Sequence, residues 1–404
     1  MKKVKNVLLP TLLAVGAAVI ATSCGGGASK GGKIGVIMED DSSGEFLAWK
    51  SYLNTVGGDL GYSFEFVKTD SSASEVNAIN TFASKGYKGV LLLSDDDVLA
   101  STKTADKNDM WVLIPTGNLL PDQYAEISKL SHFVGSVAPY EETDYEAGYN
   151  MAKHFVENLE RTNFTVFGGA AHWGVSMHYQ RLAGMFTYLC EDATTSYDGV
   201  KTHGELVGKI AGKGIDPDKF VSEKYDISGY MQGFDFDAAF STTLTNSMLA
   251  GGTAILSVGA SDAVTGIAYG IASNVPAIDV STLKVGGVDA ITSAYLPYFD
   301  MGYTYDCGKY ASAMGPGLIL LQNAIEGHPI KNAEGLAPQA NLNYWVATSK
   351  EQMQEILKVD DAEAGFCYNA KVINHYDNTS YAEFAKLCGS TYAEAKAIHD
   401  QYGK

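Results

Sequence analysis

The stretch "KIGVIMEDDSSGEFLAWKSY" (residues 33–52) begins with a short apolar run, residues 33–38, that is typical of a buried strand. A polar turn follows, and then Phe46, Trp49 and Val56 recur at helical spacing until Gly57 and Gly58 end the run. A buried strand, a polar loop and an amphipathic helix together form the repeating unit of a parallel α/β sheet. This unit decides the fold because it recurs along the chain.

The strand and helix alternation continues in two successive runs, which predict two similar lobes with parallel sheets covered by helices on both faces. The predicted strands are residues 33–38, 62–70, 89–94, 110–117 and 132–138 in the first run, and 163–169, 220–227, 253–259 and 283–289 in the second. Ligands of open α/β sheets lie beyond the carboxyl ends of the strands. The candidate ligand loops are therefore residues 39–46, 94–98, 116–118, 168–177, 226–234, 259–262 and 289–295.

The charge balance excludes some classes of partner. The chain has 47 acidic and 29 basic residues and a formal net charge of −18. Such a surface does not favour nucleic acid or a polybasic attachment to membranes. The first 24 residues join a basic start to a short apolar run and end in "ATSC", which resembles the lipobox of bacterial lipoproteins. We expect residues 1–24 to be a lipoprotein signal peptide, Cys24 to be lipidated, and residues 25–32 to be a flexible tether.

Catalytic and metal-binding motifs do not support an enzyme. The sequence contains no G-x-S-x-G, H-E-x-x-H, phosphate-binding loop or C-x-x-C motif, so we expect no catalytic residue, cofactor or metal. The aspartates at 95–97 fit a divalent cation site or, more simply, the cap of the next helix. Cys367 and Cys388 are candidates for a disulfide in an exported protein, and their spacing leaves that pairing open.

Several longer stretches resemble a known family. They are "HFVGSVAPYEETDYEAGYNMAKHF" (132–155), "SVGASDAVTGIAYGI" (257–271) and "LKVGGVDAITSAY" (283–295). With the opening stretch, they resemble type I periplasmic-binding proteins, in the sugar-binding branch with a core like those of ribose-binding proteins and LacI-type repressors. The resemblance covers about residues 33–358. It implies two Rossmann-like lobes joined by a hinge: lobe 1 from 33–138 plus about 299–345, lobe 2 from 139–298, and a C-terminal segment 346–404 with a helical extension.

The resemblance also implies ligand-binding residues in a cleft between the lobes. "HYQRLAGM" (178–185) resembles a family segment whose arginine donates to ligand hydroxyls, which indicates Arg181; its fork of donors suits vicinal hydroxyls. Asp289 matches a usual hydroxyl acceptor, and Phe46 a usual stacking ring. Glu45 replaces another stacking aromatic. The remaining candidates are Ser43, Thr116, Asn118, His172, Trp173, Tyr230, Ser261, Asp262 and Tyr305.

The family implies an extracytoplasmic, lipid-anchored protein that binds a sugar or similar polyhydroxylated molecule and delivers it to an ABC permease. Two alternatives stay open. One is a nucleoside-binding lipoprotein, and the other is a ligand-binding sensor that docks a receptor instead of a permease.

Overall fold

The computed structural model describes residues 31–93 and 97–404. The predicted signal peptide, Cys24, most of the tether, Asp95 and Asp96 lie outside these described residues. Asp97 caps the next helix, because its carboxylate accepts the backbone N–H of Ala100 at 2.9 Å. No helix in the described part of the chain combines the length and the apolar character that a membrane crossing requires.

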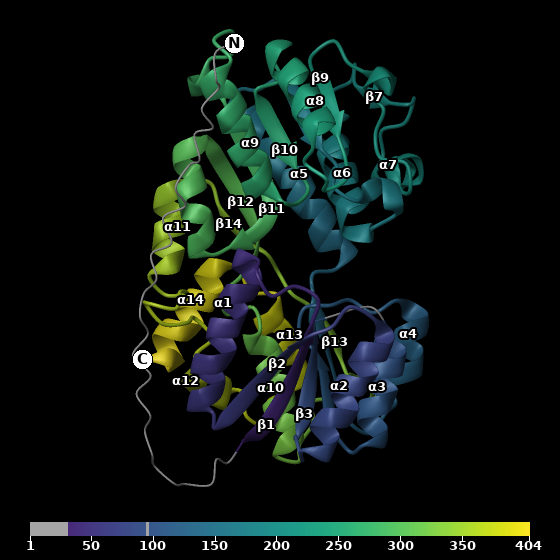
Figure 1. Ribbon diagram of the computed structural model, residues 1–404, viewed down its shortest axis with the longest axis vertical. Helices are drawn as coiled ribbons and strands as arrows, with labels where there is room; N and C mark the ends of the chain where they lie inside the picture. The colour runs from purple at the N-terminus through teal and green to yellow at the C-terminus, as the bar shows by residue number, and fades with distance from the viewer. Residues whose placement is uncertain (1–30, 94–96) are drawn as a thin grey trace, which may run out of the picture.

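Two six-stranded sheets form the centres of two lobes, which Figure 1 shows one above the other. The order of the first sheet is β13-β5-β4-β3-β1-β2, and its paired strands are all parallel. The order of the second is β14-β12-β11-β10-β6-β9, with only β14 antiparallel to its neighbour. This agrees with the predicted α/β fold of two parallel lobes. The strands are β1 (Gly32–Met38), β2 (Tyr62–Lys68), β3 (Gly89–Leu93), β4 (Trp111–Ile114), β5 (Phe133–Ala138), β6 (Asn163–Phe167), β9 (Asp226–Met231), β10 (Ala254–Ser257), β11 (Lys284–Ile291), β12 (Tyr303–Tyr310), β13 (Gln339–Asn341) and β14 (Trp345–Ala347), with a small separate pair β7 (Ser196–Tyr197) and β8 (Phe220–Val221).

Helices flank both sheets (Figure 1). Those of lobe 1 are α1 (Gly44–Tyr52) with the π-helical turn η1 (Leu53–Gly57), α2 (Ser72–Ser84), α3 (Val98–Lys107), α4 (Pro121–Ile127) and α10 (Gly315–Ile325). Those of lobe 2 are α5 (Glu141–Glu157), η2 (Ala171–Trp173), α6 (Ser176–Leu189), α7 (His203–Ile210), η3 (Pro217–Lys219), α8 (Ala238–Leu249), α9 (Ser261–Asn274), η4 (Val280–Thr282), η5 (Ser293–Met301) and α11 (Lys350–Leu357). The C-terminal extension adds α12 (Ala370–His375), α13 (Tyr381–Cys388), α14 (Tyr392–Ile398) and η6 (His399–Gly403).

One predicted strand is misplaced. Residues 220–227 do not form one strand: Phe220–Val221 pairs with β7, and β9 runs from Asp226 to Met231 beside β6. Ile227, Gly229 and Met231 are buried in alternation, as a strand with one covered face requires. The segment that the sequence suggested as a ligand loop, residues 226–234, is therefore mostly strand.

The predicted boundary between the lobes also needs correction. β12 lies within the range assigned to lobe 1, but it pairs with β11 over its whole length and belongs to the sheet of lobe 2. Within the described residues three crossovers, at 139–140, 311–314 and 342–344, join the sheets of the two lobes, and the chain returns to lobe 1 a fourth time after α11, as the C-terminal extension. The three crossovers between the sheets form the hinge.

The C-terminal extension packs on lobe 1, as the sequence suggested. The hydroxyl of Tyr52 in α1 donates to the backbone carbonyl of Tyr368 at 2.6 Å, and the rings of Tyr52 and Phe366 meet edge to face at 5.0 Å. Cys367 and Cys388 are both buried and free, so the structure contains no disulfide between them.

Candidate functional site

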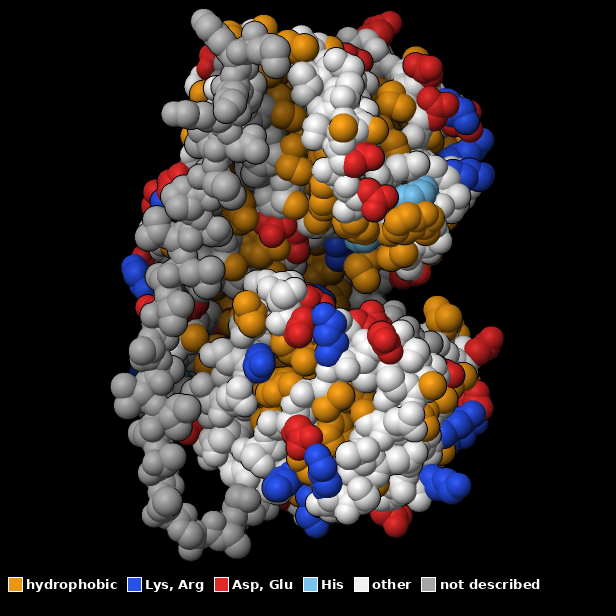
Figure 2. All heavy atoms as spheres, in the orientation of Figure 1, with side chains coloured by type: hydrophobic (Ala, Val, Ile, Leu, Met, Phe, Trp, Pro, Cys, Tyr) orange, Lys and Arg blue, Asp and Glu red, His pale blue; other side chains and the backbone are white. Residues whose placement is uncertain are grey.

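The cleft between the lobes is visible as a deep notch in the surface (Figure 2). Both sheets direct the carboxyl ends of their parallel strands towards it, as the general rule for such sheets requires. The lobes meet where α1 faces η5, and a Cβ at Gly44 would lie 2.7 Å from the Cβ of Ala294. Gly44 therefore permits the first turn of α1 to approach the opposite lobe.

Three charged groups from the two lobes gather near this contact. Glu45, at the start of α1, lies 3.4 Å from the Nζ atom of Lys309 near the end of β12. The ammonium group of Lys309 also lies 4.8 Å from the ring centre of Trp49. Burial raises the pKa of Glu45, Lys309 partly opposes this, and the carboxylate of Asp289 adds to the rise. The structure thus brings Glu45 of lobe 1 together with Asp289 and Lys309 of lobe 2.

Asp289 is held by protein donors while its side chain stays partly exposed. Its Oδ2 atom accepts the backbone N–H of Ser261 at 2.8 Å and the Ser261 hydroxyl at 3.1 Å. Burial raises the pKa of this carboxyl group, and the neighbouring Asp262 contributes to the rise. Ser261 itself is fully buried and also bonds the hydroxyl of Tyr303 at 2.8 Å. Ser261, predicted as a ligand contact, therefore orients Asp289 instead of facing the cleft.

Arg181 is buried in a network of protein partners. Its Nε donates to Asp144 at 2.8 Å, its Nη1 donates to the carbonyl groups of Val258 at 2.6 Å and Val288 at 3.3 Å, and its Nη2 donates to the hydroxyl of Tyr344 at 2.6 Å. These bonds engage four of the five N–H donors of the guanidinium group. Only 6% of the residue is exposed. Although burial opposes the charge, Tyr344 and Asp144 hold the pKa of Arg181 above its usual value.

These contacts change the interpretation of Arg181. Asp144 is in the first turn of α5, directly after the first crossover, and Tyr344 is in the third crossover. The Tyr344 hydroxyl also donates to Asp144 at 2.8 Å. Arg181 therefore fastens lobe 2 to two hinge segments, and a single N–H remains for a ligand.

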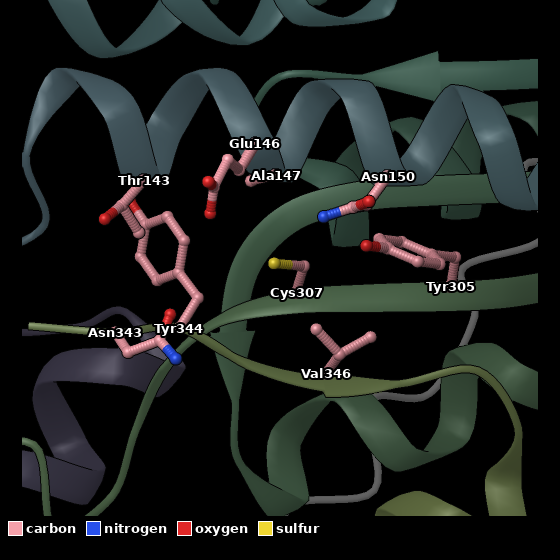
Figure 3. Close-up of a pocket in the computed structure, with 9 residues that line it drawn as sticks. All are labelled: Thr143, Glu146, Ala147, Asn150, Tyr305, Cys307, Asn343, Tyr344 and Val346. Carbon is pink, nitrogen blue, oxygen red and sulfur yellow. The ribbon is translucent and has the colours of Figure 1, made fainter. Parts of the chain in front are cut away.

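Tyr305 also differs from its predicted role. It lies in the amino-terminal half of β12, and Figure 3 shows its side chain and that of Cys307 directed towards α5, with the Tyr305 hydroxyl towards Asn150. The cavity between them has a volume of about 60 Å³ and is on the α5 side of the second sheet. Tyr305 is thus buried away from the cleft, whereas Lys309, further along the same strand, reaches it.

Two predicted stacking residues are packed inside the lobes. Phe46 is buried and contacts the ring of Phe66 edge to face at 6.2 Å. The Tyr230 hydroxyl is buried without a hydrogen-bond partner, and a Cβ at Gly168 would lie 2.1 Å from it. Tyr230 belongs to β9, is partly buried on the face opposite to Ile227, Gly229 and Met231, and packs its hydroxyl against Gly168 and Gly214. Neither ring is presented for stacking in this conformation.

The other candidates lie after strand ends. Ser43 caps α1, because its hydroxyl accepts the N–H of Phe46 at 3.2 Å. Thr116 and Asn118 follow β4, and the Asn118 amide donates to the carbonyl of Pro139 in the first crossover. Asp262 begins α9 beside Asp289, and its carboxylate accepts the N–H of Ala263 at 2.7 Å.

A group of aromatic residues follows the ends of β6 and β9. His172 and Trp173 form most of η2, with ring centres 4.3 Å apart, and 65% of Trp173 is exposed. Phe234 follows β9, is also exposed, and lies 5.9 Å from the ring of His178. These exposed rings are available for stacking on a ligand.

His178 supplies a neutral donor at the same strand ends. Its Nδ1 accepts the backbone N–H of Ala170 at 2.9 Å, so the ring proton is on Nε2, beside Gly259. Burial, with help from the charge of Arg181, lowers the pKa of His178 to about 3. The imidazole therefore stays neutral at physiological pH.

Comparisons with known proteins agree with this architecture. No protein-family model and no curated protein matches the sequence. Among solved structures, a periplasmic solute-binding protein of an ABC transporter from Actinobacillus succinogenes with bound D-allose is 15% identical, with a TM-score of 0.56 over 80% of this chain and 99% of that one. A solute-binding protein from Bacillus halodurans with bound myo-inositol is 13% identical, with a TM-score of 0.53 over 81% and 98%.

A periplasmic sugar-binding protein from Pseudomonas fluorescens is 13% identical, with a TM-score of 0.57 over 90% of this chain and 97% of that one. The fold is that of type I periplasmic-binding proteins. At these identities the likeness establishes the fold, and the ligand must be argued from the residues of the cleft.

The sequence missed Lys309, His178 and Phe234 as members of the site. Lys309 was missed because no strand was predicted at residues 303–310. His178 is not among the candidates from the sequence, and the signal that identifies it is its position after β6, beside the strand end of β10. Phe234 lies within the predicted ligand loop 226–234, but Tyr230 was selected there as the aromatic candidate.

Proposed function

We propose that this chain is the extracytoplasmic solute-binding component of an ABC importer and that it binds a sugar or similar polyhydroxylated molecule in the cleft. We further propose that a lipid on Cys24 anchors it to the outer face of the membrane. The fold supports the first part, and the sequence of residues 1–24 supports the second.

The observation that carries the proposal is the placement of Glu45, Asp289 and Lys309 at the cleft. Two carboxylates offer acceptors to ligand hydroxyls, and the ammonium group offers donors. Ser261 holds Asp289 in place before any ligand arrives, so binding loses little side-chain freedom. Exposed rings such as Trp173 and Phe234 supply apolar faces for the C–H surfaces of a sugar.

Solved structures of the same fold support the choice of ligand class by analogy. Their bound molecules include D-allose and myo-inositol. Both are neutral and carry several hydroxyl groups, which suits the carboxylate acceptors Asp289 and Glu45.

Closure of the cleft explains how binding would be signalled to a permease. Contacts to both Glu45 in lobe 1 and Asp289 in lobe 2 are complete only when the lobes approach. A ligand that bridges them therefore shifts the population towards a closed form. The closed form is the one that a permease would select.

The ligand class is tested by a thermal-shift panel on the Cys24→Ser chain, with D-allose, myo-inositol, L-arabinose, adenosine and uridine. A ligand present at about 100 times its Kd adds roughly 2.7 kcal/mol to the stability of the folded state. We expect at least one sugar or polyol to raise the melting temperature. Stabilisation by nucleosides alone would replace the sugar proposal with a nucleoside-binding protein.

The transport role is tested in cells by deleting the gene and measuring uptake of the ligand that the panel identifies. We expect uptake to fall and to return with the wild-type gene. Normal uptake combined with lost chemotaxis towards the ligand would indicate a sensor. The anchor is tested by the mass of the N-terminal peptide, which should include a lipid on Cys24 and lose it in Cys24→Ser.

A further inference from the structure

The C-terminal extension, residues 359–404, has no role in the proposed ligand binding, but several hydrogen bonds hold it on lobe 1. The amide of Gln322 in α10 donates to Asn374 at 2.9 Å, and the N–H of Asn378 donates to Asn323 at 2.7 Å. The ring of His328, just after α10, lies 2.5 Å from the carboxylate of Asp377. The extension therefore moves with lobe 1.

The extension also holds the second crossover. Asp360 is fully buried, and its carboxylate accepts the backbone N–H groups of Ser312 at 3.1 Å and Cys367 at 2.9 Å. Tyr368 lies so close to the end of this crossover that a Cβ at Gly315 would be 2.6 Å from the Cβ of Tyr368. Only glycine permits this approach without displacement of the backbone.

The third crossover is held by the end of α13. The backbone N–H of Asn343 donates to the carbonyl of Cys388 at 2.9 Å, and its side-chain amide donates to the carbonyl of Gly389 at 3.4 Å. Asn343 directly precedes Tyr344, the hinge residue that bonds Arg181. The extension therefore contacts two of the three segments about which the lobes rotate.

The extension finally reaches lobe 2. The hydroxyl of Tyr392, at the start of α14, donates to the backbone carbonyl of Glu355 in α11 at 2.9 Å. The Tyr392 ring meets the ring of Trp345 in β14 edge to face at 5.2 Å. α11 itself is tied to lobe 2, because Lys350 pairs with Asp300 of η5 at 2.5 Å. Figure 1 shows α14 between α11 of the upper lobe and α12 of the lower one.

We propose that residues 359–404, which continue directly from α11, form a brace across the hinge that limits the relative rotation of the lobes, with Tyr392 as a second contact that returns the extension to lobe 2. A segment fixed to lobe 1, to two crossovers and to α11 must break or slide at one contact when the hinge turns. The weakest of these contacts is at Tyr392, which has one hydrogen bond and one ring contact.

The brace is tested by interlobe distances in the protein without ligand, so the result does not depend on the proposed sugar. Spin labels are attached at Leu120→Cys and Met177→Cys in a Cys24→Ser background. Both positions are exposed and follow strand ends that face the cleft, and the described native cysteines are buried. Pulsed dipolar spectroscopy then gives the distance distribution for the parent chain, for Tyr392→Phe and for Tyr392→Ala.

The matched control is Tyr402→Phe, which removes a hydroxyl within the extension that accepts a hydrogen bond from the neighbouring Gln401. We expect Tyr392→Phe to raise the population outside the parent distribution about fivefold, the effect of one lost hydrogen bond. We expect Tyr392→Ala to raise it further and Tyr402→Phe to leave it unchanged. Parent-like distributions in both Tyr392 variants, or equal broadening in the control, would overturn the brace; melting curves confirm that each variant is folded.

Discussion

The Nε atom of Arg181 lies 2.8 Å from the Oδ1 atom of Asp144, and the Tyr344 hydroxyl bonds both groups. Arg181 comes from α6, Asp144 from the start of α5, and Tyr344 from the third crossover. Two charges buried together stabilise the fold only while both are present, because a single remaining charge has no solvent to compensate it. Arg181 therefore has a structural role in the hinge before any role in ligand binding.

Arg181→Ala is therefore expected to lower the free energy of unfolding by about 3 kcal/mol or more, because Asp144 is left buried without its partner. Chemical denaturation measures this loss. Arg161→Ala, at the only other arginine of the chain, is the comparison for removal of an arginine outside this network. Unchanged stability with a selective loss of ligand affinity would return Arg181 to the direct ligand-binding role that the family resemblance implies.

The packing of α5 against α6 depends on glycine. A Cβ at Gly148 would lie 1.9 Å from the backbone carbonyl oxygen of Arg181, so Gly148→Ala must separate the two helices. We expect this variant to lose about 1–3 kcal/mol of stability. Gly208→Ala in α7 is the matched control, because its Cβ would meet nothing within 4 Å. The control should gain about 0.5–1 kcal/mol from helix propensity, and equal effects at both sites would contradict the close approach.

The raised pKa of Asp360 predicts that the stability of the folded state depends on pH. Burial raises the pKa of its carboxyl group from 3.8 to about 6, against the opposing hydrogen bonds. The folded state therefore binds more protons than the unfolded chain between pH 4 and pH 6, and the contribution of Asp360 to stability falls as the pH rises through this window. The full change is roughly 3 kcal/mol.

Asp360→Asn cannot titrate, so its free energy of unfolding should change less than that of the parent between pH 4 and pH 7. Denaturant titrations at both pH values measure this difference. Parallel pH profiles for the two proteins would show that the carboxyl group has the same pKa in the folded and unfolded states.

Lys309 is expected to contribute to binding more than to folding. Its ammonium group is partly exposed between Glu45 and the Trp49 ring. Removing a charged donor to a ligand hydroxyl costs about 1.5–3 kcal/mol, so Lys309→Gln should weaken binding at least about tenfold. Lys284→Gln, at the amino end of β11, is the control at the opposite end of the sheet. If both variants bind equally well, Lys309 is only an interlobe ion pair.

Much of the fold could be predicted from local pattern. The alternation of buried strands and amphipathic helices indicated two parallel lobes, and β1 and α1 lie where the opening stretch places them. The lobe to which β12 belongs could not be predicted, because its pairing with β11 is a long-range contact and its Asp306 and Lys309 make it resemble a polar loop.

The site was harder to predict from the sequence, because it too depends on long-range contacts. The sequence indicated Arg181 as a ligand residue, but its partner Asp144 is 37 residues away and Tyr344 is 163 residues away. Asp289 was predicted at the end of a strand and lies two residues before the end of β11, whereas the support that Ser261 gives it depends on how α9 packs against β11. The sequence predicted which residue types follow the strand ends, but it did not predict the direction in which each side chain points.

The most direct test of the account is isothermal titration of the ligand found in the panel into the parent chain, Asp289→Asn and Asp279→Asn. Asp279 is an exposed cap before the amino end of β11, and asparagine can still accept the N–H of Ser281 there. We predict micromolar or tighter binding by the parent and Asp279→Asn, and a loss of at least about tenfold in Asp289→Asn. Equal affinity of all three proteins, or no binding of any sugar or polyol by the parent, would contradict a polyhydroxylated ligand held by Asp289 in the cleft.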